Sequence, residues 1–138
     1  MTFEFTIPGK PEAQGRPRAV RHGRGIRMYD PRKSKEYKDY VALIARQHAP
    51  KEPTESALGV RMKIYRQMPK STPKYKRERY NAGIERPLVK PDIDNYTKAI
   101  LDACNGIIYK DDSQVLDLNA SKYYSDNPRV EVIIQELF

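Results

Sequence analysis

The chain has 138 residues, with 26 Lys and Arg against 18 Asp and Glu, which gives a formal net charge of +8. Apolar residues make up 38% and charged residues 32%, a balance that excludes full disorder and fits one soluble domain spanning residues 1–138. The single cysteine, Cys104, excludes an intramolecular disulfide, and no signal peptide or membrane-spanning stretch is visible, so we expect a cytoplasmic protein without a membrane partner. The positive charge favours nucleic acid as a partner, with a merely basic surface as the alternative.

Apolar and polar residues alternate over residues 2–8, which predicts a half-buried strand. Residues 9–29 are predicted to be a long basic loop with a single acid, Glu12. Loops of this length in a compact domain are usually functional or disordered. We expect this one to bind phosphates through Lys10, Arg16, Arg18, Arg21, Arg24 and Arg27.

Asp30 and Pro31 predict the start of a helix over residues 31–48, with Asp30 as N-cap and a stripe of Tyr37, Tyr40, Val41 and Ile44. A strand is predicted over 57–67. Residues 69–83 predict a short polar helix capped by Thr72, opened by Pro73 and closed by Gly83. That helix is either solvated or directed at phosphate, with Lys74 and Lys76 as candidate contacts.

A further helix is predicted over 95–104, because Ala99, Ile100, Ala103 and Cys104 form an apolar face that Asn105 and Gly106 end. Two strands over 114–124 and 129–137 flank a turn at Asn127 and Pro128, which predicts an antiparallel hairpin. The element order predicts an α+β fold, a small mixed β-sheet packed with helices. The apolar strand 130–134 is a candidate dimer interface.

The segment KPDIDNYTKAILDACNGIIYKDDSQV, residues 90–115, concentrates acids in a basic protein. In an extended chain Asp92 and Asp94 point to the same face, so both can reach one ion. After the helix, a short strand could return Asp111 and Asp112 to the same end. Oxygen ligands alone favour Mg²⁺, with Mn²⁺ as a second possibility, and no small-molecule cofactor is expected. Such an ion activates water at a phosphodiester.

Each of these residues also has an ordinary structural explanation. Asp94 could cap the helix, Asp92 could pair with Lys90, and Asp111 and Asp112 could form a turn. Lys98 follows Asp94 by four residues and could stabilise a phosphate in transition, but it could equally form a helix salt bridge with Asp102. His22 and His48 have no metal-ligand spacing, and Cys104 fits a small core residue.

The segment 90–115 closely resembles the signature of the RusA family of Holliday junction resolvases, which reads approximately KPD-x-DN, a Lys, LDALNG and DD-x-Q-V. IPGKPEAQGRPRAVRHGRGIRMYDPRKSKEY and MPKSTPKYKRERYNAG resemble the family's basic and middle regions, so the resemblance covers most of the chain. It places the metal-binding acids on Asp92, Asp94 and Asp112 and the catalytic lysine on Lys98. Asp111 ranks below Asp112, although strand alternation puts Asp112 beside Leu116 and Leu118 unless a strand end or bulge intervenes. Asn95 and Gln114 match supporting positions, whereas Tyr96 and Cys104 depart from the pattern.

The resemblance implies a Mg²⁺-dependent homodimeric endonuclease, common in prophages, that cuts four-way DNA junctions in recombination and repair and leaves 5′-phosphate ends. The expected DNA contacts are Lys10, Arg16, Arg18, Arg21, Arg24, Arg27, Lys74, Lys76 and Lys90. The alternatives are a junction-binding protein that does not cut, a nuclease for other branched nucleic acids, and a basic protein-interaction domain.

Overall fold

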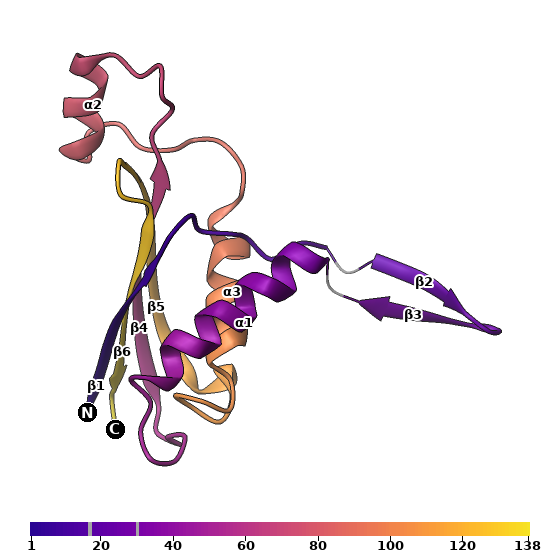
Figure 1. Ribbon diagram of the computed structural model, residues 1–138. Coiled ribbons are helices and arrows are strands. Elements are labelled where there is room, and N and C mark those ends of the chain that lie inside the picture. Colours follow the sequence, from indigo (N-terminus) through magenta and orange to yellow (C-terminus); the bar gives the residue numbers. More distant parts are fainter. Residues whose placement is uncertain (17, 30) are drawn as a thin grey trace.

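The computed structural model has a four-stranded mixed sheet at its centre, with two helices on one face of that sheet (Figure 1). It describes residues 1–16, 18–29 and 31–138, without the side chains of Arg18 and Tyr29. The elements in chain order are β1 (Thr2–Pro8), β2 (Arg18–His22), β3 (Gly25–Tyr29), α1 (Arg32–Arg46), β4 (Leu58–Gln67), α2 (Lys74–Asn81), α3 (Ile93–Cys104), the 3₁₀ turn η1 (Asp112–Gln114), β5 (Val115–Ser125) and β6 (Arg129–Glu136). The predicted α+β fold is confirmed. No helix within the described ranges is long and apolar enough to cross a membrane.

The sheet has the order β1-β6-β4-β5, in which β6 runs antiparallel to β1 and β4 while β5 runs parallel to β4. The predicted hairpin of the last two strands is therefore wrong, because β4 lies between them. Both inner strands of the sheet bury one face: Val60, Met62 and Ile64 of β4 are at most 4% exposed, as are Val130, Val132 and Ile134 of β6. A parallel pair needs a long crossover, and the segment containing α2 and α3 supplies it.

The core lies between the sheet and the helices α1 and α3. Helix α1 buries Tyr37, Val41 and Ala45 at intervals of four, as an amphipathic helix requires. Tyr40 is not part of this stripe, because it is 39% exposed and its hydroxyl donates to the Pro8 carbonyl at 2.8 Å. Strand β6 turns Val130, Val132 and Ile134 into the same core, whereas Ile133, within the strand predicted as a dimer interface, lies on the opposite face of the sheet.

Helix α1 begins one residue later than predicted. Pro31 is its N-cap and lies outside the first turn, while the predicted cap, Asp30, lies outside the described residues. For α2, Thr72 is not the cap, because Pro73 occupies that position and the Thr72 hydroxyl donates to the Pro69 carbonyl at 2.6 Å. Gly83, with a φ of +73°, ends α2 as predicted, since this backbone conformation suits glycine.

The predicted loop 9–29 contains a two-stranded antiparallel ribbon, formed by β2 and β3, that projects from the body of the protein (Figure 1). Its turn is Gly23 and Arg24, with Gly23 at a φ of +59°. A glycine at the first turn position suits the tight turns that match the twist of paired strands. We refer to residues 18–29 as the β2–β3 ribbon.

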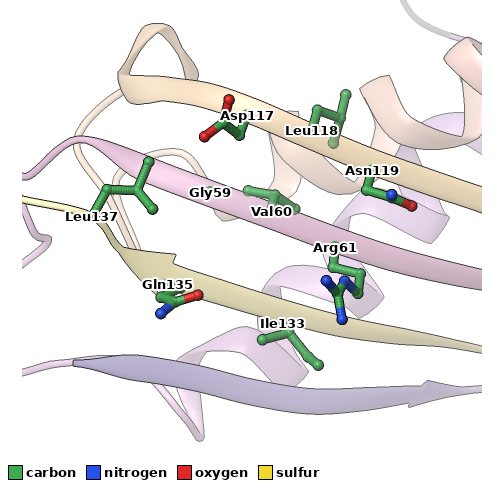
Figure 2. Close-up of a pocket in the computed structure, with 9 residues that line it drawn as sticks. All are labelled: Gly59, Val60, Arg61, Asp117, Leu118, Asn119, Ile133, Gln135 and Leu137. Atoms are coloured by element: carbon green, nitrogen blue, oxygen red, sulfur yellow. The ribbon is translucent and has the colours of Figure 1, made fainter.

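The face of the sheet opposite α1 and α3 is open (Figure 2). A shallow hollow of about 460 Å³ on this face is lined by side chains that include Arg61, Asn119 and Gln135. Among its described lining residues, Asp117 is the only acid. None of the acids predicted to bind metal lines this hollow.

Candidate active site

Asp92 and Asp94 lie at the start of α3, where the helix dipole favours negative charge. Asp92 is the N-cap in an extended conformation, but its side chain makes no capping bond. Asp94 sits inside the first turn, where its Oδ1 accepts from the Asn95 amide at 3.0 Å. The helix thus begins two residues earlier than predicted, and the structural explanation of Asp94 as N-cap is wrong.

This early start also changes how the two acids are related. They were expected to share a face of an extended chain, but Asp94 is helical, so they line neighbouring hollows. The Thr97 hydroxyl donates to the Ile93 carbonyl at 2.9 Å within the first turn of the helix. Asp92 faces a hollow of about 590 Å³ beside Arg86 and Leu88.

Three cations hold the segment that precedes Asp92. The Lys122 ammonium donates to the carbonyls of Val89 and Pro91 at 3.1 and 3.2 Å. Arg66 donates to the Lys90 carbonyl at 3.1 Å, and Arg86 donates back to the Lys122 carbonyl at 2.9 Å. The position of Asp92 is therefore fixed by side chains of β4 and β5, since the bonds reach the residue next to it.

The paired acids at 111 and 112 have different surroundings. Asp111 caps η1: its Oδ2 accepts from the Ser113 amide at 3.0 Å, and its own amide donates to Gln114 Oε1 at 2.9 Å. These bonds from Ser113 stabilise the ionised carboxylate and lower the pKa of Asp111. The Gln114 amide then donates to the carbonyls of Thr54 and Ser56, both at 2.9 Å. Asp111 is thus occupied in holding the turn.

Asp112 is half-buried and lines a second hollow of about 480 Å³ between α3 and β5. We call it the α3–β5 hollow; it is lined by Ile93, Asp94, Thr97, Lys98, Leu101, Asp112, Leu118 and Ala120. As strand alternation suggested, Asp112 and Leu118 face the same side of the chain. That side faces the α3–β5 hollow and not the hydrophobic core. Asp112 also precedes the strand, and the β4–β5 register shifts after Val115, so both a strand end and an irregularity are present.

The chain reaches Asp112 by a route that differs from the predicted one. No strand among the described residues joins α3 to η1; Ile108 and Tyr109 instead form a buried turn against the end of the helix. The Tyr109 hydroxyl donates to the Leu101 carbonyl at 2.6 Å, and burial raises its pKa. Asp112 therefore comes soon after the C-terminal end of α3 in the chain. Strand β5, which follows Asp112, runs back toward the start of that helix.

Lys98 projects into the α3–β5 hollow one turn after Asp94. The predicted helix salt bridge also forms, with 3.3 Å between the Lys98 ammonium and Asp102 Oδ2. Lys38 from α1 approaches the same carboxylate oxygen at 3.9 Å, so Asp102 is shared by two lysines. The Lys98 side chain is 61% exposed, which leaves it accessible to a phosphate bound in the hollow.

The chemistry of these donors suits Mg²⁺, because Asp92, Asp94 and Asp112 offer oxygen ligands and form no ion pair with any residue in the described part of the chain. Within the described ranges, however, no three acidic, histidine or cysteine side chains lie close enough to hold one ion. Mg²⁺ commonly takes one or two carboxylates and completes its coordination with water and substrate phosphates. The residues therefore fit an ion that binds together with DNA.

The predicted DNA-binding cations lie on several elements. Lys10 and Arg16 are exposed between β1 and the β2–β3 ribbon, and Lys90 is exposed next to the tethered segment. The ribbon itself carries Arg21, Arg24 and Arg27, all exposed, whereas the side chain of Arg18 lies outside the described residues. On α2, Lys74 is exposed and Lys76 is half-buried.

Sequence reasoning missed a stack of aromatic and cationic side chains beside the site. Tyr65 and Tyr123 stack with ring centroids 5.3 Å apart, and Arg129 and Arg86 cover their outer faces at 3.8 and 4.3 Å. Arg86 therefore links this stack to the hollow that contains Asp92. The available signal was the placement of Tyr65 and Tyr123 at outward positions of two strands.

Two comparisons with known proteins find matches over nearly the whole chain. The chain is 52% identical over 138 residues to a Bacillus subtilis (strain 168) protein named "Uncharacterized protein YqaN", with 98% of this chain and 96% of that protein covered. The family described as "Endodeoxyribonuclease RusA" matches residues 8–135, a range that contains the acids, Lys98 and all of the predicted DNA contacts. The chain therefore belongs to the RusA family of endodeoxyribonucleases.

Proposed function

We propose that this protein resolves four-way DNA junctions by metal-dependent hydrolysis of phosphodiester bonds. The observation that carries the proposal is the α3–β5 hollow, into which Asp94, Lys98 and Asp112 all project. Membership in an endodeoxyribonuclease family supports the chemistry, and the hollow identifies the residues to test. Paired incisions in strands of like polarity would resolve the junction, in recombination and repair, into nicked duplexes with 5′-phosphate ends.

In this proposal Asp92, Asp94 and Asp112 would come together around Mg²⁺, or Mn²⁺, only when phosphate oxygens of the DNA bind the ion as well, because without DNA the three do not lie close enough to hold it. The ion would supply charge neutralisation and a water of lowered pKa. Lys98, which lines the hollow, would contact the phosphate and stabilise the charge that develops on it. Lys122 and Arg66 would keep Asp92 in place through the carbonyls that they bind.

The positive residues around the hollow would bring the DNA to it. Contacts with phosphates supply affinity and orientation without reading base sequence. The candidates lie on separate elements, which suits a ligand with several arms. They are Lys10, Arg16, Arg18, Arg21, Arg24, Arg27, Lys74, Lys76 and Lys90.

We also propose that the protein acts as a homodimer. Two incisions must be made across a two-fold symmetric junction, and a two-fold dimer presents two identical sites to it. Val130, Val132 and Ile134 of β6 are buried in the core, so they are not available for this contact. The open face of the sheet, on which Ile133 lies, is the surface that we propose for the contact (Figure 2).

The direct test is to compare the wild-type protein and Asp94→Asn on a synthetic mobile four-way junction, with Mg²⁺ and with EDTA, on a denaturing gel. We expect paired, symmetric incisions only for the wild type with Mg²⁺, and retained or tighter junction binding for the variant because a negative charge near DNA is lost. Unchanged cleavage by Asp94→Asn would rule out the proposed site. A junction that is bound but never cut would favour a binding protein, and a substrate panel of flaps and forks would identify a nuclease for another branched structure.

A further inference from the structure

The β2–β3 ribbon is built unlike the rest of the protein. Its strands pair only with each other and form a sheet separate from the central one, away from which they extend (Figure 1). Five residue pairs join the strands, from Arg18 and Tyr29 to His22 and Gly25. At roughly 3.3 Å per residue, the ribbon reaches on the order of 17 Å from its base to its turn.

The two faces of the ribbon differ in character. Because directly paired residues share a face, one face carries Ala19, Arg21, Ile26 and Met28, and the opposite face carries Val20, His22 and Arg27. Ile26 is 75% exposed and Met28 is 59% exposed. The ribbon buries no core of its own, so these two neighbouring apolar side chains contribute nothing to folding that is visible in the described residues. Exposed apolar groups that lie together commonly mark a binding surface.

The charge of the ribbon limits what can cover that surface. Residues 13–29 contain no Asp or Glu and five arginines, at positions 16, 18, 21, 24 and 27. Exposed Arg21 lies on the same face as Ile26, and Arg24 occupies the turn. An apolar pair edged by arginines suits a partner that presents apolar surface within a frame of phosphates, which is the arrangement at an interrupted DNA stack.

We propose that the Ile26 and Met28 face of the ribbon contacts the base-pair faces exposed at the branch point of DNA, and that this contact gives the protein its preference for branched over duplex DNA. The inference rests on the proposed function. Arginines bind the phosphates of duplex and branched DNA alike, so they supply affinity without this preference. Base-pair faces are covered by stacking in a duplex and become available where the stack is interrupted, and apolar side chains are known to insert at such steps.

The geometry is compatible with this contact. A two-stranded ribbon fits within the major groove, which is about 12 Å wide, so the strands can pass between DNA arms. In this orientation the turn at Gly23 and Arg24 enters the DNA first. Ile26 lies two residues after Arg24, on β3. Arg24 would reach the phosphates beyond the branch point while Ile26 and Met28 meet the bases.

The test uses the full chain, in EDTA, so that binding is measured without cleavage. The variant Ile26→Ser/Met28→Ser is compared with Val20→Ser, which removes an apolar side chain from the opposite face of the same ribbon. Dissociation constants are measured for a four-way junction and for a duplex of matched sequence, and 2-aminopurine fluorescence is recorded with the probe at the branch point. Thermal unfolding checks that both variants keep the fold, which the ribbon's position outside the core favours.

For the double variant we expect junction affinity to fall about tenfold or more, with duplex affinity and its salt dependence unchanged and with loss of the 2-aminopurine response. Val20→Ser should stay within about twofold of the wild type on both DNAs. Equal losses on junction and duplex, unchanged junction preference, an equal effect of Val20→Ser, or dissociation of a dimer without a change in preference would each overturn the inference. So would a wild-type protein that has no preference for the junction.

Cleavage with Mg²⁺, assayed separately at saturating protein, distinguishes this inference from the proposed function. If the wild type cuts junctions and the double variant keeps its junction preference, the inference fails and the function stands. If the wild type binds junctions without cutting and the double variant loses the preference, the contact at the branch point stands and the nuclease function fails.

Discussion

The helices α2 and α3 follow one another in the chain and are held in opposite ways. Helix α3 buries Tyr96, Thr97, Ala99, Ile100, Ala103 and Cys104 against the sheet and α1. Helix α2 buries no residue, and its links to the body include an ion pair between Arg77 and Asp126 at 2.6 Å and a contact between Tyr80 and Tyr124. The contrast indicates that the two helices have different roles. Helix α3, which is anchored in the core, carries the residues proposed for catalysis, whereas α2, which buries no residue, presents positive charge to the solvent.

The strongest test of this division concerns the acids of the α3–β5 hollow. Asp112→Asn should lower junction cleavage by about a thousandfold, because an amide replaces a charged ligand for the ion. Asp111→Asn should cleave nearly as well as the wild type, because asparagine retains a side-chain oxygen that can accept from the Ser113 amide. Single-turnover rates with Mg²⁺ measure both variants. A reversal of the two results would move the proposed site to Asp111.

A second test compares what the two helices contribute to stability. Ile100 is 1% exposed on α3, whereas Tyr75 is 64% exposed on α2. Ile100→Ala should lower the free energy of unfolding by roughly 3 kcal/mol, because it leaves a cavity in the core. Tyr75→Ala should change it by less than about 0.5 kcal/mol. Urea denaturation followed by circular dichroism gives both values, and similar losses would mean that α2 is packed more tightly than its exposure indicates.

A third test concerns the hydrogen bonds from the Lys122 ammonium that hold the segment before α3, which we call the tether. Lys122→Met removes the donor to the carbonyls of Val89 and Pro91, so Asp92 should lose its fixed position and cleavage should slow by about tenfold. Lys63→Met, an exposed lysine on the neighbouring strand, removes the same charge without touching the tether. The expected pattern is a lower kcat for Lys122→Met with junction affinity like that of Lys63→Met. An equal slowing of cleavage in the two variants would show that the lost charge, and not the tether, accounts for the effect. Two variants that cleave like the wild type would show that the tether is not needed.

The mildest change is expected for α2. The combined change Lys74→Ala/Lys76→Ala should weaken junction binding in a salt-dependent way and reduce the slope of log affinity against log salt concentration by about one for each phosphate that the lysines no longer neutralise. The cleavage rate at saturating DNA should not change, since neither lysine lines the α3–β5 hollow. Filter binding across a salt series measures the slope. A fall in the saturated rate would place α2 within the chemistry.

Periodicity predicted the elements that bury one face. Phe3, Phe5 and Ile7 alternate as a strand does, and α1 and α3 repeat their buried residues at helical intervals, so their existence and approximate bounds could be predicted from the sequence. The β2–β3 ribbon could not be predicted in this way. Neither of its faces is buried, and arginines interrupt its apolar residues, so its alternation has no apolar side to detect.

The arrangement of neighbours required the structure. A short turn between β5 and β6 is compatible with a hairpin, and only the strand pairing in the structure shows that β4 lies between them. In the same way, residue type and spacing singled out Asp112, but the capping bonds that separate it from Asp111 depend on Ser113 and Gln114 adopting a 3₁₀ turn. The hydrogen bond from Lys122 to the Pro91 carbonyl joins residues that are 31 apart in the sequence, so no local sequence pattern predicts it.

Strands β1 and β6 lie side by side and run antiparallel, so the two ends of the chain meet at the same edge of the molecule (Figure 1). The Glu136 amide donates to the Met1 carbonyl at 3.0 Å. A linker of a few residues could therefore join Phe138 to Met1 without disturbing the sheet, and new ends could be opened at the exposed turn of Gly23 and Arg24. Such a circular permutant would keep the α3–β5 hollow and would remove the covalent connection between β2 and β3 at the tip of the ribbon.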